Sequence, residues 1–126
     1  MSFRWNDFLE LATQLSVRLP DDRLTEARFR SAISRAYYAA FCSCRQVLQQ
    51  QSGTAFLHTE NIHAMVRLQL KQSTDPDHQR MGALLHRLRR LRNQADYDEH
   101  VVPLESQVWE SLTIARDILA QLGSPP

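Results

Sequence analysis

The amino-acid sequence predicts an all-α protein, an up-and-down four-helix-type bundle with one additional helix. Only 3 glycines and 5 prolines occur in 126 residues, too few for the many turns that a β-sandwich or β-barrel requires. Apolar residues recur at three- and four-residue spacing in five long segments, and no segment shows the alternation of a strand. The length suits one hydrophobic core, so we expect residues 1–126 to form a single domain.

The first two helices are expected at residues 3–18 and 22–51, separated by a break at Pro20. The apolar stripe of the first helix consists of Trp5, Phe8, Leu9, Ala12 and Leu15. The second helix is apolar on several sides between residues 36 and 41, which predicts a position at the centre of the bundle or in an oligomer interface. Gly53 fits a C-terminal helix cap.

Three further helices are expected at residues 59–72, 76–95 and 103–122, with residues 96–102 as a polar connection. Pro76 and Pro103 mark helix starts, because proline is favoured at the first helical position and disfavoured further in. These three helices complete the five of the predicted bundle.

Charge and cysteine content narrow the class of protein. The formal net charge of +1 excludes a strongly basic nucleic-acid coat but allows a local basic patch. Neither a signal core nor an apolar run approaching about 18 residues is found, so we expect no membrane span. Cys42 and Cys44 fit a reducing cytosol, and two thiols alone complete no zinc site. We therefore expect a cytoplasmic protein without a metal or another cofactor.

The basic residues are almost all arginine, since Lys71 is the single lysine among 15 basic residues. Residues 80–92 hold five arginines and no acid. By their spacing Arg89, Arg92 and Asp96 share one helix face, and Arg92 can pair with Asp96. This arginine strip is either a solvated helix surface or a surface that binds phosphate or a partner protein.

Two motifs resemble those of HEPN-domain proteins, in the small bacterial and archaeal branch of that superfamily. Residues 34–41 read SRAYYAAF and resemble its S-R-x-Y-Y-A-x-F signature, while residues 92–97 read RNQADY and resemble its R-N-x-A-D-Y segment. The N-terminal WNDFL of residues 5–9 also agrees. The resemblance implies a helical bundle that usually forms a symmetric homodimer. Many members are metal-independent ribonucleases, and many small members pair with a minimal nucleotidyltransferase as toxin and antitoxin.

The ribonuclease motif of the family is an arginine, usually followed by asparagine, with a histidine four to six residues beyond the arginine. Arg92 and Asn93 match its first half, but Tyr97 stands where the histidine would be. A tyrosine with a pKa near 10 is only about 0.1% ionised at neutral pH, so Tyr97 is a poor general base. It can still donate a hydrogen bond or stack on a nucleobase. His100 lies outside the spacing, although a loop could fold it back towards Arg92.

Further residues are candidates for the binding site or for packing. Arg35, Arg89, Arg92 and Asp96 are predicted to contact phosphate or a partner, or to orient such contacts. Tyr37 and Tyr38 are predicted to pack, with a dimer interface or a ligand cleft as the alternative. His63 is expected to be a bundle histidine with a hydrogen-bond partner.

Three functional hypotheses follow. The favoured one is a module that binds RNA or nucleotide phosphate, carries a degenerate ribonuclease motif, and acts with a nucleotidyltransferase in a toxin–antitoxin or defence-type system. The second is an active ribonuclease that uses Arg92 with His100 or Tyr97. The third is a structural bundle that binds only another protein.

Overall fold

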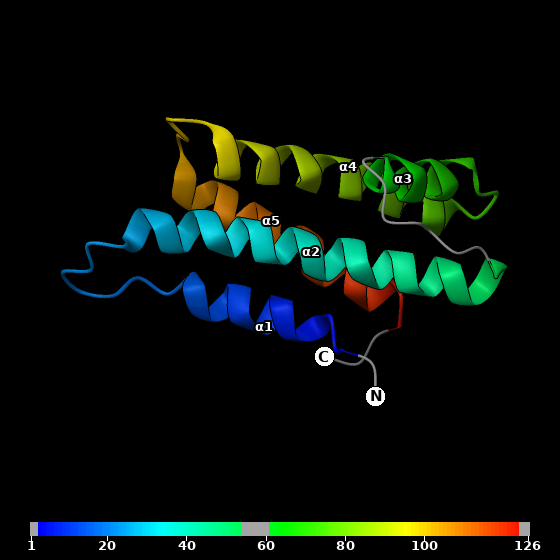
Figure 1. The fold of residues 1–126 in the computed structure, drawn as a ribbon, viewed down its shortest axis with the longest axis horizontal. Helices are drawn as coiled ribbons and strands as arrows, with labels where there is room; N and C mark the ends of the chain where they lie inside the picture. Colours follow the sequence, from blue (N-terminus) through cyan, green and yellow to red (C-terminus); the bar gives the residue numbers. More distant parts are fainter. Residues whose placement is uncertain (1–2, 54–60, 124–126) are drawn as a thin grey trace.

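The computed structural model describes residues 3–53 and 61–123, which form five helices and no strand. The helices are α1 (Asn6–Leu15), α2 (Thr25–Ser52), α3 (Ile62–Gln72), α4 (Pro76–Tyr97) and α5 (Leu104–Gln121). Four of them, α1, α2, α4 and α5, alternate in direction, and the short α3 packs as the additional helix (Figure 1). The predicted all-α bundle is confirmed.

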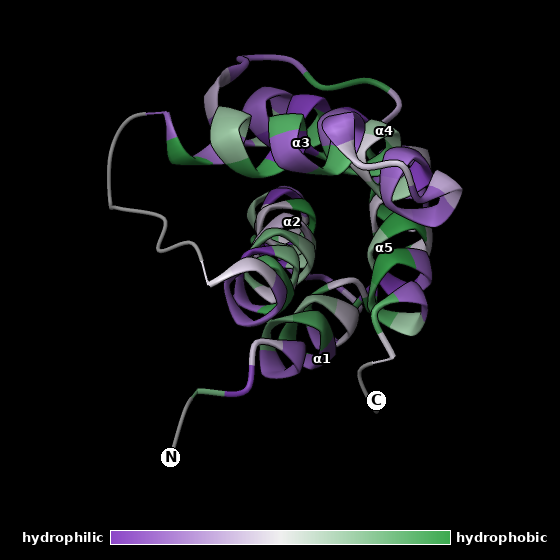
Figure 2. Ribbon diagram, turned by 90° about the vertical axis from the view of Figure 1, so that its right-hand side faces the viewer, coloured by the Kyte–Doolittle hydropathy of each residue, from purple (hydrophilic) through white to green (hydrophobic). Residues whose placement is uncertain are grey.

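Helix α2 is the central element, because it contacts each of the other four helices. Seen along its axis, it lies among α1, α3, α4 and α5, with hydrophilic residues towards the outside of the bundle (Figure 2). The fully buried small residues of α2 are Ala32, Ala36, Ala39 and Ala40. Such small side chains allow neighbouring helices to approach closely. The prediction of a helix buried on more than one face is therefore confirmed.

The helix ends differ from the predicted ones by up to three residues. Helix α1 covers Asn6–Leu15 rather than residues 3–18, and α5 covers Leu104–Gln121 rather than residues 103–122. Helix α2 begins three residues later than predicted, because Asp22 forms a turn in which its carboxylate accepts the N–H of Leu24 at 3.0 Å. Gly53 takes the predicted cap position, with a positive φ of 69° and its N–H bonded to Gln49 O at 3.0 Å. Asp75 caps α4 at Pro76 as predicted, and the predicted start of the third helix, Thr59, lies outside the described residues.

Helix α4 extends two residues beyond its predicted end at Ala95, and the reason is Arg30 on α2. The guanidinium of Arg30 donates hydrogen bonds to the carbonyls of Ala95, Asp98 and Glu99 at 3.1, 2.5 and 3.0 Å. The last carbonyls of a helix have no partner within the helix, so Arg30 satisfies that of Ala95 and also anchors Asp98 and Glu99, which follow the helix. Asp96 and Tyr97 therefore belong to α4 rather than to the polar connection.

Helices α3 and α4 approach each other closely at Gly82. A Cβ atom at this position would lie 3.2 Å from Leu70 Cβ and 3.4 Å from Lys71 N. Ile62, Val66 and Leu70 of α3 are buried in the contact between α3 and the rest of the bundle. This packing places the first turn of α3 beside α2 and α4.

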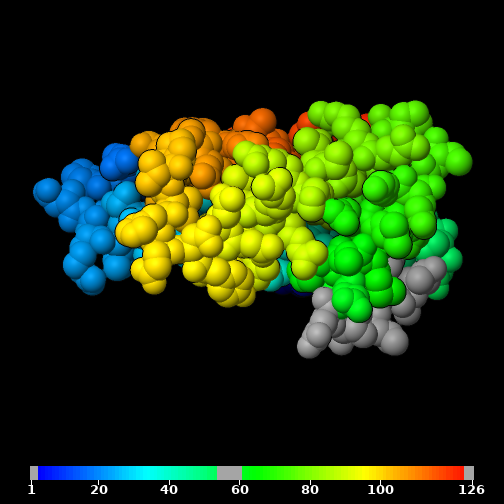
Figure 3. Space-filling view, turned by 90° about the horizontal axis from the view of Figure 1, so that it is seen from above, coloured from blue at the N-terminus to red at the C-terminus, as the bar shows by residue number. Residues whose placement is uncertain are grey.

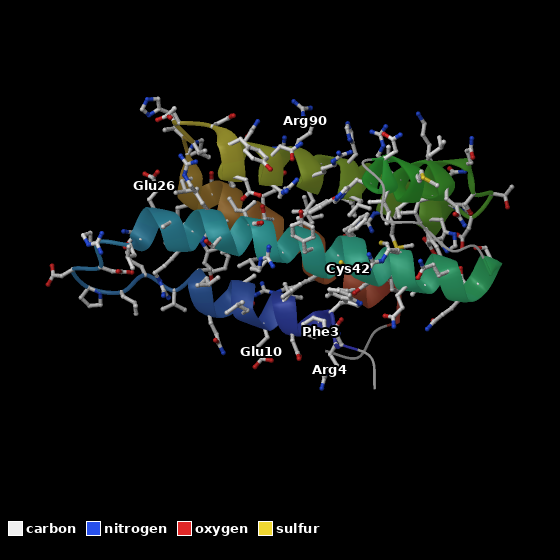
Figure 4. The ribbon with its side chains drawn as sticks, in the orientation of Figure 1. Phe3, Arg4, Glu10, Glu26, Cys42 and Arg90 are labelled. Atoms are coloured by element: carbon white, nitrogen blue, oxygen red, sulfur yellow. The ribbon has the colours of Figure 1, made fainter. Side chains whose placement is uncertain are left out.

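The two cysteines lie on α2 and are free thiols enclosed by the bundle (Figure 4 labels Cys42). Cys42 is 5% exposed and Cys44 is fully buried. Burial raises the pKa of both thiols, that of Cys44 to about 12. Within residues 3–53 and 61–123, no group of histidine, cysteine and acidic residues is suited to hold a metal ion. None of the helices described combines the length and apolar character needed to cross a bilayer.

Candidate functional site

Arg92 on α4 lies among the rings of three tyrosines. Its guanidinium carbon is 5.9 Å from the ring centre of Tyr37, 5.2 Å from that of Tyr38 and 5.7 Å from that of Tyr97. These distances suit cation–π attraction, which holds a guanidinium without consuming its N–H groups. Only 15% of the Arg92 side chain is exposed. Arg92 is therefore positioned by packing and is not a freely solvated surface arginine.

Two polar neighbours on α4 fix the orientation of Arg92. Its Nε donates to Asp96 Oδ2 at 2.8 Å and its Nη1 donates to Asn93 Oδ1 at 3.0 Å. The predicted ion pair between Arg92 and Asp96 is thus confirmed. Ser34 on α2 donates to the same Asp96 oxygen at 3.4 Å, which links the two sequence motifs. The remaining N–H groups of Arg92 make no hydrogen bond to any described residue.

Two arginines of α2 also lie over aromatic rings, and Arg35 shares Tyr38 with Arg92. Arg35 stacks on Phe8 and Tyr38 at 4.8 and 5.0 Å, and Arg45 lies 5.4 Å from the Trp5 ring centre and 5.9 Å from that of Phe41.

Arg89 lies one turn before Arg92 on α4, and its buried Nε has no hydrogen-bond partner. We call Arg35, Arg45, Arg89 and Arg92 the arginine cluster. Among the described residues, Asp96 is the one carboxylate that forms an ion pair with a member of this cluster.

His63, on the first turn of α3, completes the surroundings of the arginine cluster. Its Nδ1 is 2.5 Å from the hydroxyl oxygen of Tyr37, which is the hydrogen-bond partner expected for this residue. The imidazole stacks on Phe41, with ring centres 4.2 Å apart. Burial and the positive charges of Arg89, Arg92 and Arg45 lower the pKa of His63 to about 4. The imidazole is therefore neutral at physiological pH.

The two tyrosines of the first motif have different environments. Tyr37 is fully buried, and burial raises the pKa of its hydroxyl well above the usual value, so it does not act as a base. Tyr38 is half-buried and lies between Arg35 and Arg92. Both tyrosines pack as predicted, Tyr37 within the core and Tyr38 against its edge, and Tyr38 also lies against the arginines.

Comparison with known protein families agrees with the two motifs. A family model described as HEPN domain matches residues 21–123. The chain belongs to the HEPN domain family. No match was found among curated proteins or among solved structures.

In this HEPN domain the residue that takes the place of the motif histidine, Tyr97, lies at the surface. Tyr97, in the last turn of α4, is 74% exposed and lies beside Arg92. Its ring therefore has a free face next to a positively charged group.

His100 lies in the exposed connection between α4 and α5. Arg30 ties the backbone of Asp98 and Glu99, the two residues before it, to α2. No hydrogen bond or ring contact joins His100 to Arg92 in the described part of the chain. The structure thus brings Asn93, Asp96 and Tyr97 to Arg92, but not His100.

The other arginines of α4 lie on different sides of the helix. Arg87 forms a two-pronged ion pair with Glu110 of α5 at 2.8 and 2.9 Å, and Arg80 pairs with Asp117 of the same helix. Arg90 points away from the bundle (Figure 4). In the space-filling view, α4 and α3 form one continuous face over the bundle (Figure 3). The arginines of the predicted strip therefore lie in three environments: beside the acids of α5, on the outward side of α4, and beside α2 and α3. The order of residues in the sequence did not show these partners.

Proposed function

We propose that this HEPN domain binds the phosphate groups of single-stranded RNA, or of a nucleotide, at the arginine cluster. The observation that carries the proposal is the contrast in pairing. Arg89 makes no hydrogen bond or ion pair with a described residue and Arg92 keeps unused N–H groups, whereas the arginines facing α5 are paired with acids. A planar guanidinium with open N–H groups matches the geometry of phosphate oxygens.

Tyr97 and Tyr38 supply surfaces for nucleobases beside these phosphate contacts. The ring of Tyr97 is exposed, and it lies 5.7 Å from the Arg92 guanidinium. Single-stranded nucleic acids bind where a positive surface follows the backbone and aromatic rings stack on the bases. This arrangement favours RNA over a phosphate ion alone.

Fluorescence anisotropy with a short labelled single-stranded RNA tests the proposal. We expect binding at low salt, with an affinity that falls as salt rises because counterions are released. Arg92→Ala should weaken binding and reduce the salt slope by about 0.7 per lost phosphate contact. Arg90→Ala is the matched control, because it removes the same charge from the outward side of the same helix.

Two outcomes would contradict the proposal. Equal affinities of the Arg92→Ala and Arg90→Ala variants would show that the arginine cluster is not the site. Absence of salt-sensitive binding would favour the structural bundle that binds only another protein.

The alternative reading is a metal-independent endoribonuclease that uses Arg92 with His100 or Tyr97. Incubation of the purified protein with single-stranded RNA in EDTA tests it directly. Cleavage that disappears in Arg92→Ala would replace the binding proposal by an enzymatic one. We expect the RNA to stay intact, because neither candidate base has the contacts of a poised general base.

The resemblance to small HEPN proteins also supports a homodimer that acts beside a minimal nucleotidyltransferase, as a toxin–antitoxin or defence-type pair in the cytoplasm. Light scattering after size-exclusion chromatography tests the dimer, and a monomer would contradict it. The identity of the neighbouring genes, and co-expression with a minimal nucleotidyltransferase encoded there, test the pair. Failure of the two proteins to co-purify would contradict that part of the proposal.

A further inference from the structure

The imidazole of His63 lies close to Arg89, Arg92 and Arg45 and has one ring nitrogen without a partner among the described residues. Its Nδ1 is taken by the Tyr37 hydroxyl at 2.5 Å. Its Nε2 makes no hydrogen bond to any described residue and is not enclosed by the bundle. The ring is held in place by stacking on Phe41 and Tyr37, with centres 4.2 and 5.6 Å away. A fixed ring with one open nitrogen is a suitable ligand contact.

The Tyr37 hydroxyl determines which ring nitrogen carries the proton. Tyr37 is fully buried, and its hydroxyl has no partner other than His63 Nδ1 in the part of the chain described. A buried O–H without an acceptor is strongly unfavourable, so the hydroxyl donates to Nδ1. In a neutral imidazole the proton then resides on Nε2, which becomes a hydrogen-bond donor.

Burial, together with the charges around it, keeps His63 neutral. Arg45, Tyr37 and Tyr38 face it from α2, and Arg89 and Arg92 face it from α4. Because the surrounding charges are positive, a second proton on the ring is disfavoured at neutral pH. At the same time, these charges would draw a phosphate to the space beside Nε2.

We propose that His63 is a ligand-binding residue of the arginine cluster, which donates its Nε2–H to an oxygen of the phosphate held by Arg89 and Arg92. This inference rests on the proposed function and adds a residue from α3 to a site otherwise built from α2 and α4. In this tautomer Nε2 has no free lone pair, so His63 acts as a donor and not as a general base.

Two substitutions at His63 distinguish the contribution of its N–H donor to RNA binding from that of its stacked ring. His63→Phe keeps the stacking on Phe41 and removes the donor, so RNA affinity should fall about ten-fold. His63→Gln restores an N–H donor at a similar reach and should recover affinity to within about three-fold of the wild type. His78→Phe is the control, because His78 contacts Ser73 and Asp75 at the start of α4, away from the arginine cluster. Circular dichroism and thermal unfolding verify that each variant is folded.

Nitrogen NMR of the histidine rings tests the tautomer without any ligand. We expect a neutral His63 with its proton on Nε2, and a shift towards the other tautomer in Tyr37→Phe, which lacks the donor hydroxyl. Tyr37→Phe should also weaken RNA binding.

A wild-type ring protonated on Nδ1 would overturn the inference. Unchanged affinity of His63→Phe, with a loss in Arg92→Ala, would also overturn it while leaving the proposed function standing. Unchanged affinity in both variants would overturn both proposals.

Discussion

Arginines on the two sides of α4 have different kinds of partner. Towards α5, Arg80 and Arg87 meet the carboxylates of Asp117 and Glu110. Towards α2 and α3, Arg92 lies over tyrosine rings and pairs with one carboxylate, that of Asp96, and Arg89 and Arg92 both face the neutral His63. Pairing with an acid occupies the N–H groups of a guanidinium, whereas stacking on a ring leaves them open. The partner helix therefore decides which arginines can bind a further anion.

The largest expected effect comes from removing two arginines from each side in turn. The double variant Arg89→Ala with Arg92→Ala should lose about a hundred-fold in RNA affinity, since each arginine contributes charge-assisted hydrogen bonds. The double variant Arg80→Ala with Arg87→Ala changes the net charge by the same amount and should lose far less. Equal losses in anisotropy titrations would mean that overall charge, and not the arginine cluster, drives binding.

The next effect concerns the exposed ring at the end of α4. Tyr97→Ala should weaken RNA binding about ten-fold, because an exposed ring beside Arg92 loses its stacking on a base. Tyr97→Phe keeps the ring and should stay within about two-fold of the wild type. A loss in Tyr97→Phe as large as in Tyr97→Ala would assign the role to the hydroxyl instead.

A smaller effect is expected in the pH dependence of the free energy of unfolding. The pKa of His63 is about 4 in the folded protein and about 6.5 when unfolded, so the unfolded chain takes up the proton first as pH falls. The stabilisation is fully present above pH about 6.5 and is lost as pH falls towards about 4. Because solvent reaches part of the ring, we expect a loss of about 1 kcal/mol.

Urea unfolding near pH 7 and near pH 4 measures this loss. His63→Gln cannot titrate and should show a weaker decline in the free energy of unfolding than the wild type. Parallel declines in the two proteins would contradict the assignment to His63.

The smallest effect is expected on the α5 side. Arg87 and Glu110 are 46% and 39% exposed, and such surface pairs stabilise proteins by only about 0.5 kcal/mol. Arg87→Ala should therefore change the free energy of unfolding by a few tenths of a kcal/mol in urea titrations and leave RNA affinity nearly unchanged. A loss of several-fold in affinity would extend the site to this side of α4.

The sequence predicted the features that depend on near neighbours in the chain. Apolar periodicity located the helices, and the spacing of four residues predicted the ion pair of Arg92 with Asp96. Gly53 and Pro76 correctly marked a helix end and a helix start. Each of these depends on geometry within one helix turn.

Features that depend on contacts between helices were not predictable in the same way. The end of α4 depends on Arg30, which is 65 residues from Ala95 in the chain. The position of His63 beside Arg89 and Arg92 depends on how α3 crosses α4. The joint presence of two family motifs was the one signal that their residues meet, and it did not include His63.

The buried thiols of α2 have a practical consequence for measuring these interactions. Thiol-reactive dyes attack the thiolate, and Cys42 and Cys44 are both enclosed and hard to ionise in the folded protein. A single cysteine introduced at the outward-pointing Arg90 would therefore react selectively at neutral pH, with both native cysteines left in place. The natural chain already provides a background for attaching one fluorophore near the arginine cluster, from which RNA binding and self-association could be followed by fluorescence.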